Sequence, residues 1–257
     1  MNTKEKWIAF RIIVAKEVKR FLRIWVQTLI PPAITVVLYF VIFGKLIGPR
    51  IGDMGGRDYM QYIVPGLIMM SVITNSYSNV VASFFSSKFQ KSVEEMLVSP
   101  LSISIIIRGY VMGGVARGIS VGAIVTVLAL FFTQLTLFNI LVTVSIVLLT
   151  AILFSLGGFI NAVFATKFDD ISIVPTFVLT PLTYLGGVFY SIDLLPPFWA
   201  MVSKANPIVY MVNGFRYGIL GISDVGLIET YGMIILFIVG LYGWALYLMN
   251  RGIGIRS

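Results

Sequence analysis

Six apolar runs, each long enough to cross a lipid bilayer, constrain this chain more than any other feature of its sequence. A spanning helix needs about 20 consecutive, mostly apolar residues, and only 12% of the 257 residues are charged. The runs cover residues 24–46, 59–83, 101–133, 139–165, 171–190 and 230–250. The sequence therefore predicts an all-α integral membrane protein, with six transmembrane helices in a single domain over residues 1–257.

The basic residues gather on one side of the predicted membrane. Seven of the 19 lysines and arginines lie within residues 1–23, before the first run. Loops rich in Lys and Arg stay in the cytoplasm, so both termini are predicted to be cytoplasmic. Topology thus explains the net charge of +8, and no nucleic-acid partner is expected. Because the chain has no Cys and no His, we expect neither a metal site nor a catalytic residue.

The segment at 1–23 has the periodicity of an amphipathic helix. Its aromatic side chains, Trp7 and Phe10 among them, recur at three- or four-residue steps and share one face. Lys16 and Arg20 fall on the opposite face. This pattern is typical of a helix that lies in the membrane interface with its bases toward anionic lipid. The alternative is a simple basic anchor with no further role.

The loop at 86–100 carries the signals of a short cytoplasmic helix. Ser87 and Gln90 have the spacing of a capping box, and Pro100 ends the segment. Its apolar side chains form one stripe, which consists of Phe89, Val93, Met96 and Leu97. The segment is either a docking helix for a partner or a solvated connector.

The stretch at 171–221 is nearly as apolar as a span, yet Pro and Gly interrupt it repeatedly. The interruptions are Pro181, Gly186, Gly187, Pro196, Pro197 and Pro207. An unpaired backbone amide in hydrocarbon costs several kcal/mol, so broken helices persist only against protein or along a cavity. We therefore expect a re-entrant element; the alternative is a periplasmic loop whose prolines merely end the spans. Arg216 would bind an anionic headgroup or pair with Asp193, Asp224 or Glu229.

The third run combines small residues with an ionisable one. Gly114, Gly118 and Gly122 recur at four-residue steps and predict close packing against a neighbouring helix. Arg117 lies between them. An arginine at membrane depth is a functional candidate because its burial is costly, but its long side chain can also reach the interface. Both roles stay open for Arg117.

Two motifs resemble those of a known family. The run Lys91-Ser-Val-Glu-Glu-Met-Leu-Val-Ser-Pro-Leu-Ser102 is similar to the cytoplasmic loop motif of ABC-2 type permeases, the membrane subunits of ABC exporters. The segment 179–216, with Leu195-Pro196, Pro207 to Tyr210 and Arg216, resembles the C-terminal signature of the same family. Together with the six runs, the motifs cover essentially the whole chain. The combination is similar to bacterial inner-membrane members whose ATPase is a separate polypeptide.

The resemblance implies a role for each of these segments. Two permease chains, expected as a homodimer, would form the pathway above two ATPase subunits. The coupling helix at 86–100 would place its apolar stripe in an ATPase groove, with Glu94 and Glu95 at the basic rim. A re-entrant helical hairpin at 194–228, between spans five and six, would close the extracytoplasmic end. Its gate residues are expected to be Pro196, Pro197, Asn206, Pro207, Tyr210 and Arg216.

These expectations describe the permease subunit of an ATP-driven ABC exporter in the bacterial inner membrane. The chain has no G-x-x-x-x-G-K-[ST] phosphate loop, so the partner ATPase would bind ATP and Mg, and no cofactor is expected on this chain. An apolar lumen would suit an amphipathic or hydrophobic substrate such as a lipid, a lipid-linked glycan or a drug. The alternatives are an ion-gradient-driven transporter or channel and a membrane scaffold that transports nothing.

Overall fold

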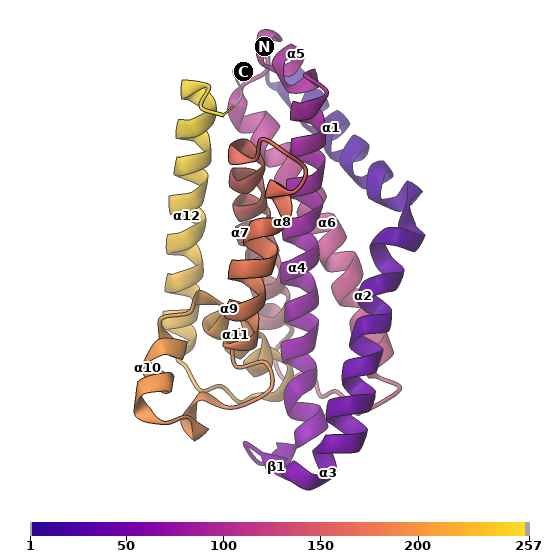
Figure 1. Ribbon diagram of the computed structural model, residues 1–257, viewed down its shortest axis with the longest axis vertical. Helices are drawn as coiled ribbons and strands as arrows, with labels where there is room; N and C mark the ends of the chain where they lie inside the picture. The colour runs from indigo at the N-terminus through magenta and orange to yellow at the C-terminus, as the bar shows by residue number, and fades with distance from the viewer. Residues whose placement is uncertain (1, 255–257) are drawn as a thin grey trace.

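A computed structural model describes residues 2–254 as a bundle of long helices (Figure 1). Five of the helices in this range are long and apolar enough to cross a membrane. They are the continuous helix Trp25–Ile51, α4 (Tyr59–Phe89), α6 (Ile103–Ala129), α7 (Ile140–Phe164) and α12 (Leu227–Arg251). Each coincides with a predicted apolar run, so the helices expected at five of the six runs are confirmed.

The first long helix is assembled from three pieces. α2 (Trp25–Tyr39) continues through a π-helical segment, η1 (Phe40–Ile47), into α3 (Gly48–Ile51). Pro31 and Pro32 lie within α2, and each lacks the N–H group that would continue the hydrogen-bond ladder. The helix nevertheless continues, because the remaining turns on both sides keep their own bonds.

The fifth run, expected as a span over 171–190, is helical for only part of its length. Three short pieces follow each other directly: α8 (Asp170–Val174), the π-helical η2 (Pro175–Leu179) and α9 (Thr180–Tyr184). Each has 5 residues, so together they rise about 22 Å, less than the roughly 30 Å of a bilayer core. Gly187, with a φ of +68°, then turns the chain. The helix is thus shorter than the run that predicted it.

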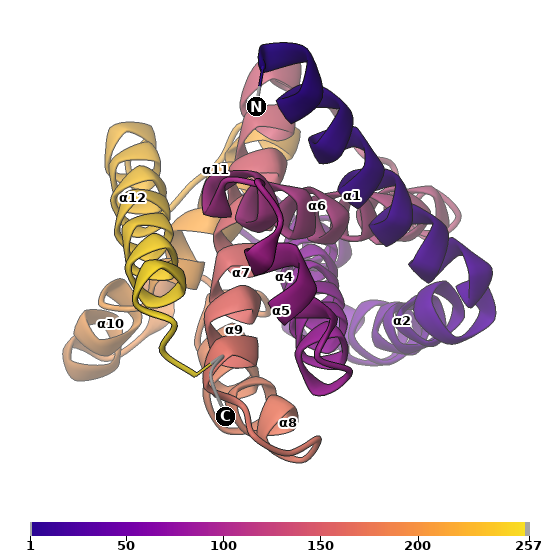
Figure 2. The same cartoon turned by 90° about the horizontal axis from the view of Figure 1, so that it is seen from above.

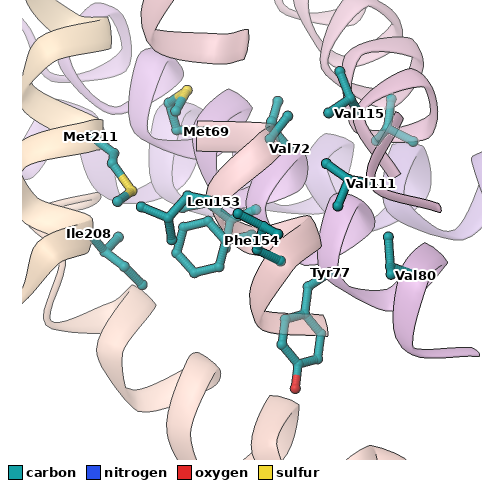
Figure 3. Close-up of a cluster of buried hydrophobic side chains, with 14 of the residues drawn as sticks. Met69, Val72, Tyr77, Val80, Val111, Val115, Leu153, Phe154, Ile208 and Met211 are labelled. Atoms are coloured by element: carbon teal, nitrogen blue, oxygen red, sulfur yellow. The ribbon is translucent and has the colours of Figure 1, made fainter. Parts of the chain in front are cut away.

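α4 is the centre of the bundle. It packs against α6, α7 and α11 (Pro207–Leu220), and most of its side chains are buried. Figure 3 shows how Met69 and Val72 of α4 gather with Leu153 of α7 and Met211 of α11 in the apolar core. The other long helices are therefore positioned by their contacts with α4.

Glycines allow α6 to approach α4 closely. A Cβ atom on Gly114 would lie 2.8 Å from the Ser76 carbonyl oxygen, and one on Gly118 would lie 3.2 Å from the Val72 carbonyl oxygen. A Cβ on Gly122 would lie 2.8 Å from the Val72 side chain. Larger residues would force the two backbones apart. The helix-packing role predicted for this glycine stripe is confirmed.

The two ends of the bundle carry different elements (Figure 1). At one end lie the start of α1 (Thr3–Arg23), the end of α12 and the short helix α5 (Ser92–Val98). At the other lie α3, α10 (Pro197–Lys204) and a small antiparallel hairpin of β1 (Asp53–Met54) and β2 (Arg57–Asp58). These are called the α5 end and the α10 end below.

Viewed along the bundle, α1 and α2 lie on one side of α4 and α12 lies on the other (Figure 2). Within the range 194–228, expected to be a helical hairpin, α10 follows the 3-10 turn η3 (Ile192–Leu194) and leads into α11. α11 packs against α4, α7 and α12, and most of its side chains are buried. It is an internal helix, unlike the solvated loop that was the alternative.

Candidate functional site

A sharp turn separates α5 from α4. Lys91 adopts the left-handed conformation, with a φ of 61°, which is uncommon for a residue other than glycine. α4 ends at Phe89, with Gln90 as its C-cap. The helix expected over 86–100 is therefore two pieces, the last turn of α4 and then α5. Because Ser87 and Gln90 lie where a helix ends, the capping box predicted from them, a helix-start motif, is wrong.

The turn divides the expected coupling residues between the interior and solvent. Val93 is completely buried in the hydrophobic core, because α5 folds back on α4; it packs inside this chain and not in a partner's groove. Val98, which the predicted stripe did not include, is 89% exposed. The other expected residues are reachable to different degrees: Phe89, Glu94, Glu95 and Pro100 are exposed, and Met96 and Leu97 are half-buried.

Two contacts fasten this segment to the end of α7. The Lys88 Nζ donates hydrogen bonds to the carbonyl oxygens of Val163, at 2.7 Å, and Ala165, at 2.6 Å. These carbonyls belong to a helix end, where acceptors lack intrahelical partners. The Phe168 ring meets the Phe89 ring edge-on, with centroids 5.0 Å apart. The last turn of α4, against which α5 packs, is therefore tied to the end of α7.

Asp170 closes the turn that follows α7. Its carboxylate accepts hydrogen bonds from the backbone N–H groups of Thr166, at 2.8 Å, and Lys167, at 2.9 Å, and from the Thr166 hydroxyl, at 2.8 Å. These donors favour the charged form and hold the pKa of Asp170 below its ordinary value. The turn beside the Lys88 contact is therefore stabilised at neutral pH.

α1 turns a different face to the bundle from the one that its aromatic residues suggest. The buried side chains of α1 are Ile13, Glu17 and Phe21, at four-residue steps. Trp7 is exposed and stacks on the half-buried Phe10, with ring centroids 5.6 Å apart. A stacked aromatic pair is thus present at the start of α1, and the aromatic surface does not extend along the helix.

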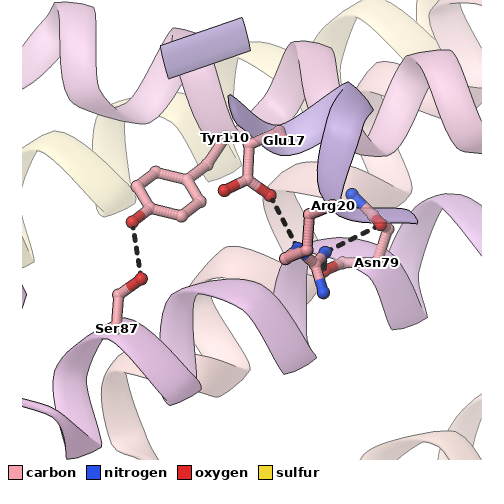
Figure 4. A network of polar contacts seen from close by, with 5 residues as sticks. All are labelled: Glu17, Arg20, Asn79, Ser87 and Tyr110. Carbon is pink, nitrogen blue, oxygen red and sulfur yellow. Dashed lines mark hydrogen bonds and ion pairs between the residues drawn. The ribbon is translucent and has the colours of Figure 1, made fainter. Parts of the chain in front are cut away.

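Arg20 points into the bundle, and not toward the membrane surface as expected (Figure 4). Its Nη2 donates to the side-chain oxygen of Asn79, at 2.8 Å, and to the carbonyl oxygen of the same residue, at 3.0 Å. Its Nε lies 3.4 Å from Oε2 of the fully buried Glu17. Residues three apart on a helix are neighbours, so Arg20 shares the buried face of Glu17. Lys16 stays exposed, with its Nζ 5.9 Å from the centroid of the Tyr110 ring.

A second arginine is held in the same way, one turn along α4. The Arg117 Nη2 donates to Asn75 Oδ1, at 3.1 Å, and to the Thr28 carbonyl oxygen of α2, at 3.3 Å. Asn75 and Asn79 are four residues apart and therefore lie on one face of α4. We call the two pairs, Arg20–Asn79 and Arg117–Asn75, the arginine seam. Arg117 is bound inside the chain, which excludes its extension to the interface.

A groove of about 330 Å³ opens beside the arginine seam, between α2 and α4. Polar side chains line it from both helices, and they include Gln27, Thr35 and Thr74, which are exposed. These residues belong to helices of spanning length. Polar groups that face lipid are costly, so we expect protein or water to cover this side of the molecule.

Prolines begin both helices of the hairpin region. Pro196 is the N-cap of α10 and Pro197 is its first residue, while Pro207 is the first residue of α11. Proline fits these positions because the N–H groups of a first helical turn have no partner within the helix.

Asn206 and Tyr210 connect α11 to its neighbours. The Asn206 Oδ1 accepts a bond from the amide two residues on, at 3.0 Å, and its Nδ2 donates to the Leu182 carbonyl oxygen of α9, at 2.6 Å. The Tyr210 hydroxyl donates to the Lys204 carbonyl oxygen at the end of α10, at 3.0 Å. The structure thus brings most of the predicted gate residues together at the α10 end, as helix ends and connectors.

Arg216 is fully buried, and it forms no ion pair with any carboxylate in residues 2–254. Its guanidinium donates to the carbonyl oxygens of Gly187, at 2.7 Å, and Tyr62, at 3.3 Å, and to Asn213 Oδ1, at 3.2 Å. The guanidinium carbon also lies 4.0 Å from the centroid of the Tyr62 ring. Asp224, an expected partner, instead accepts bonds from the Ser191 hydroxyl and the Ile192 backbone N–H, at the start of η3. Both roles expected for Arg216 are replaced by a third: it ties α11 to α4 and to the Gly187 turn.

Several residues of these sites were not singled out from the sequence: Glu17, Asn75, Asn79 and Lys88. The two asparagines carry a usable signal, because they are four residues apart within a predicted span. Glu17 is an acid within a basic segment, which gives a weaker signal. Nothing in the sequence around Lys88 indicates its contact with α7.

The helices of spanning length, the buried arginine seam and the internal α11 define a multi-pass helical membrane protein. Residues 8–220 match the family described as ABC-2 type transporter. The chain is 61% identical over 251 residues to the inner membrane transport permease YadH of Escherichia coli strain K12, which covers 98% of each chain. It is 23% identical to nodulation protein J of Rhizobium leguminosarum biovar trifolii, over 79% of this chain and 78% of that protein.

The chain therefore belongs to the ABC-2 type transporter family. It is a transport permease of the inner membrane, which confirms the family resemblance of the two sequence motifs.

Proposed function

We propose that this chain is the membrane subunit of an ATP-driven exporter and that a separate ABC ATPase docks on its cytoplasmic α5 end. The observation that carries the proposal is the attachment of α5: Val93 buries it against the bundle, and Lys88 ties the preceding turn to α7. Phe89 and Val98 remain exposed there. This arrangement offers a partner an apolar surface and transmits its movement to two long helices.

Two copies of the chain would form the pathway, with six crossings in each copy. The α8–η2–α9 segment would be the fifth crossing, completed by the turn that follows it, and both termini would be cytoplasmic. The start of α1 and the end of α12 lie at the same end of the bundle (Figure 1), which supports an even number of crossings. The polar groove between α2 and α4 supports a second copy, because that copy would cover groups that lipid cannot satisfy.

The α10–α11 hairpin would close the outer end of the pathway as a re-entrant element. α11 is packed inside the bundle, whereas Phe198, Trp199 and Met201 of α10 are exposed. Aromatic side chains of this kind are enriched where a membrane meets water. A groove of about 430 Å³ between α7, α9, α11 and α12 has mostly apolar walls, which favours an amphipathic or hydrophobic substrate such as a lipid, a lipid-linked glycan or a drug.

The docking proposal is tested with the double variant Phe89→Asp/Val98→Asp. Both side chains are exposed, so the bundle should still fold, whereas a carboxylate at the buried Val93 would disrupt it. We expect the variant to insert into membranes normally but to lose co-purification with an ABC ATPase from native membranes. Phe198→Asp on α10 is the matched control, since Phe89 and Phe198 are each 62% exposed. Retained association in the double variant, or equal loss in the control, would overturn the assignment of α5.

Buried Glu17 is the observation that favours the ion-gradient alternative. Its carboxylate oxygens receive no hydrogen bond from the described residues and have only the 3.4 Å ion pair with Arg20. An acidic residue at such a position can carry a proton in gradient-driven transporters. Transport that persists without ATP, follows the proton gradient and fails in Glu17→Gln would establish that alternative.

A further inference from the structure

A large polar cleft lies between α1 and the α5 end of α4. Its volume is about 600 Å³, within the usual range for small-ligand sites. Four cationic side chains line one wall: Lys16, Lys19, Arg20 and Arg23. The other wall is lined by uncharged polar side chains, namely Ser83, Ser86, Ser87, Gln90 and Ser92. Among residues 2–254, no carboxylate lines the cleft.

The charges around this cleft do not balance. Glu17 is fully buried and pairs with Arg20 at 3.4 Å. Its negative charge therefore offsets the positive charge of one of the four cations, although Glu17 does not line the cleft. Three positive charges remain, and this is the only ion pair within residues 2–254. Like charges gathered around one cavity repel each other and attract a counter-anion.

Two serine hydroxyls that line the cleft accept hydrogen bonds from other side chains of the protein. The Tyr110 hydroxyl donates to Ser87 Oγ at 2.9 Å (Figure 4). In the same way, Gln90 Nε2 donates to Ser86 Oγ at 3.3 Å. Because each serine oxygen already accepts a bond from inside the chain, its own proton is free to donate to a ligand. Cations and hydroxyls together are the donors that a phosphate prefers.

The surroundings of the cleft are apolar on the membrane side. α1 passes directly into α2 after Arg23, and the next residues, Ile24, Trp25 and Val26, have exposed side chains. A ligand held at the cleft by its charged end would find an apolar surface beside it. About two turns from Ser83 along α4, at Asn75, the seam adds the guanidinium of Arg117.

We propose that this cleft binds the phosphate of a phosphate-bearing lipid headgroup, with the acyl chains against the α1–α2 corner. Lys19, Arg23 and the Ser86 and Ser87 hydroxyls bind the phosphate oxygens. That this lipid is transported cargo, received from the cytoplasmic leaflet, rests on the proposed function. The binding itself requires no ATPase.

The test uses the purified full-length chain in phosphatidylcholine nanodiscs, with phosphatidic acid titrated in and bound lipid counted by native mass spectrometry. Lys19→Gln/Arg23→Gln should weaken phosphatidic acid binding by about tenfold or more, since two charged contacts are lost. The matched control is Lys6→Gln/Arg11→Gln, which removes the same charge from exposed positions on α1 outside the cleft. It should change binding by no more than about twofold. Equal losses in the two variants would show diffuse surface attraction and overturn the site.

Two further measurements distinguish a specific lipid site from simple charge attraction and from a site for small anions. Ser86→Ala/Ser87→Ala keeps every charge and should still weaken binding severalfold; unchanged binding overturns the built site. Inorganic phosphate is added as a competitor, and displacement of the lipid by an equal concentration of it would show a small-anion site and overturn the lipid assignment. Thermal unfolding of each variant controls for folding. ATPase association of the unaltered chain is measured in parallel. If the chain binds phosphatidic acid but no ATPase, only the proposed function is contradicted. If it binds an ATPase but no phosphatidic acid, only this inference is contradicted.

Discussion

Replacing Arg216 with alanine will destabilise the whole bundle and will not act on an outer gate alone. The side chain is fully buried and donates to Gly187, Tyr62 and Asn213. Truncation leaves two backbone carbonyls without these donors and empties the space over the Tyr62 ring. Because α11 contacts α4, α7 and α12, the loss reaches three long helices.

The magnitude follows from these contacts. Three hydrogen bonds from a charged donor contribute about 2 kcal/mol each, and a desolvated cation–π contact contributes about 2 kcal/mol more. Burying the guanidinium costs several kcal/mol in return. We therefore expect Arg216→Ala to lower the free energy of unfolding by about 3–5 kcal/mol. At 2–4 °C per kcal/mol for a chain of this size, the melting temperature should fall by about 10 °C.

The assay is thermal unfolding of the purified chain in detergent, followed by tryptophan fluorescence, together with ATPase association. Tyr62→Phe is the matched control: it keeps the ring under the guanidinium and the backbone carbonyl, so its melting temperature should change by no more than about 3 °C. Arg216→Ala should lower stability, ATPase association and transport together. A variant with an unchanged melting temperature and a selective loss of transport would refute this reasoning and restore the gate assignment.

Three further predictions concern other parts of the bundle. Gly158→Ala should lower stability by about 1–3 kcal/mol, because its Cβ would lie 2.5 Å from the Tyr77 carbonyl oxygen, whereas Gly157→Ala, with 3.6 Å to the nearest ring atom, should be tolerated in the same unfolding assay. Lys88→Met should keep ATPase association but lower transport by about tenfold, because it removes the donors to the α7 carbonyls; unchanged transport in reconstituted vesicles would contradict this role. The depressed pKa of Asp170 means that its turn is stabilised at neutral pH and loses this stabilisation only as the pH falls below about 4. Amide hydrogen exchange in the turn should therefore be protected down to about pH 4 and should be faster throughout in Asp170→Asn, because a neutral amide oxygen is a weaker acceptor than a carboxylate.

Hydropathy was sufficient for the elements whose stability depends on length and apolar surface. Five predicted runs are long helices, and Gly114 and Gly118 lie where their spacing predicted close packing. The run at 171–190 is not one long helix. Hydropathy measures only how apolar the side chains are, so it does not show where the backbone hydrogen bonds of a helix end. The helix of this run ends at Tyr184, before the turn at Gly187, although the composition of the run matches that of a span.

The polar contacts could not be predicted because their partners are distant in the sequence. Arg20 binds Asn79, 59 residues away, and Arg216 binds a carbonyl of Tyr62, 154 residues away. A periodicity argument identifies which side chains share a helix face but not which face meets the core. The left-handed conformation of Lys91 could not be predicted either, since no local sequence rule places a lysine in that conformation. It converted an expected single helix into two.

The attachment of α1 has a consequence for the order in which the chain is built. α1 leaves the ribosome before its partners Asn79 and α6, which emerge several seconds later at typical rates of synthesis. Until then, Glu17 can meet only the neighbouring Arg20, on the same helix. Before α1 docks, the stacked rings of Trp7 and Phe10 can hold it at the membrane surface, because aromatic side chains favour the membrane interface. Docking of α1 therefore waits for α4 and α6, although α1 itself is made before them.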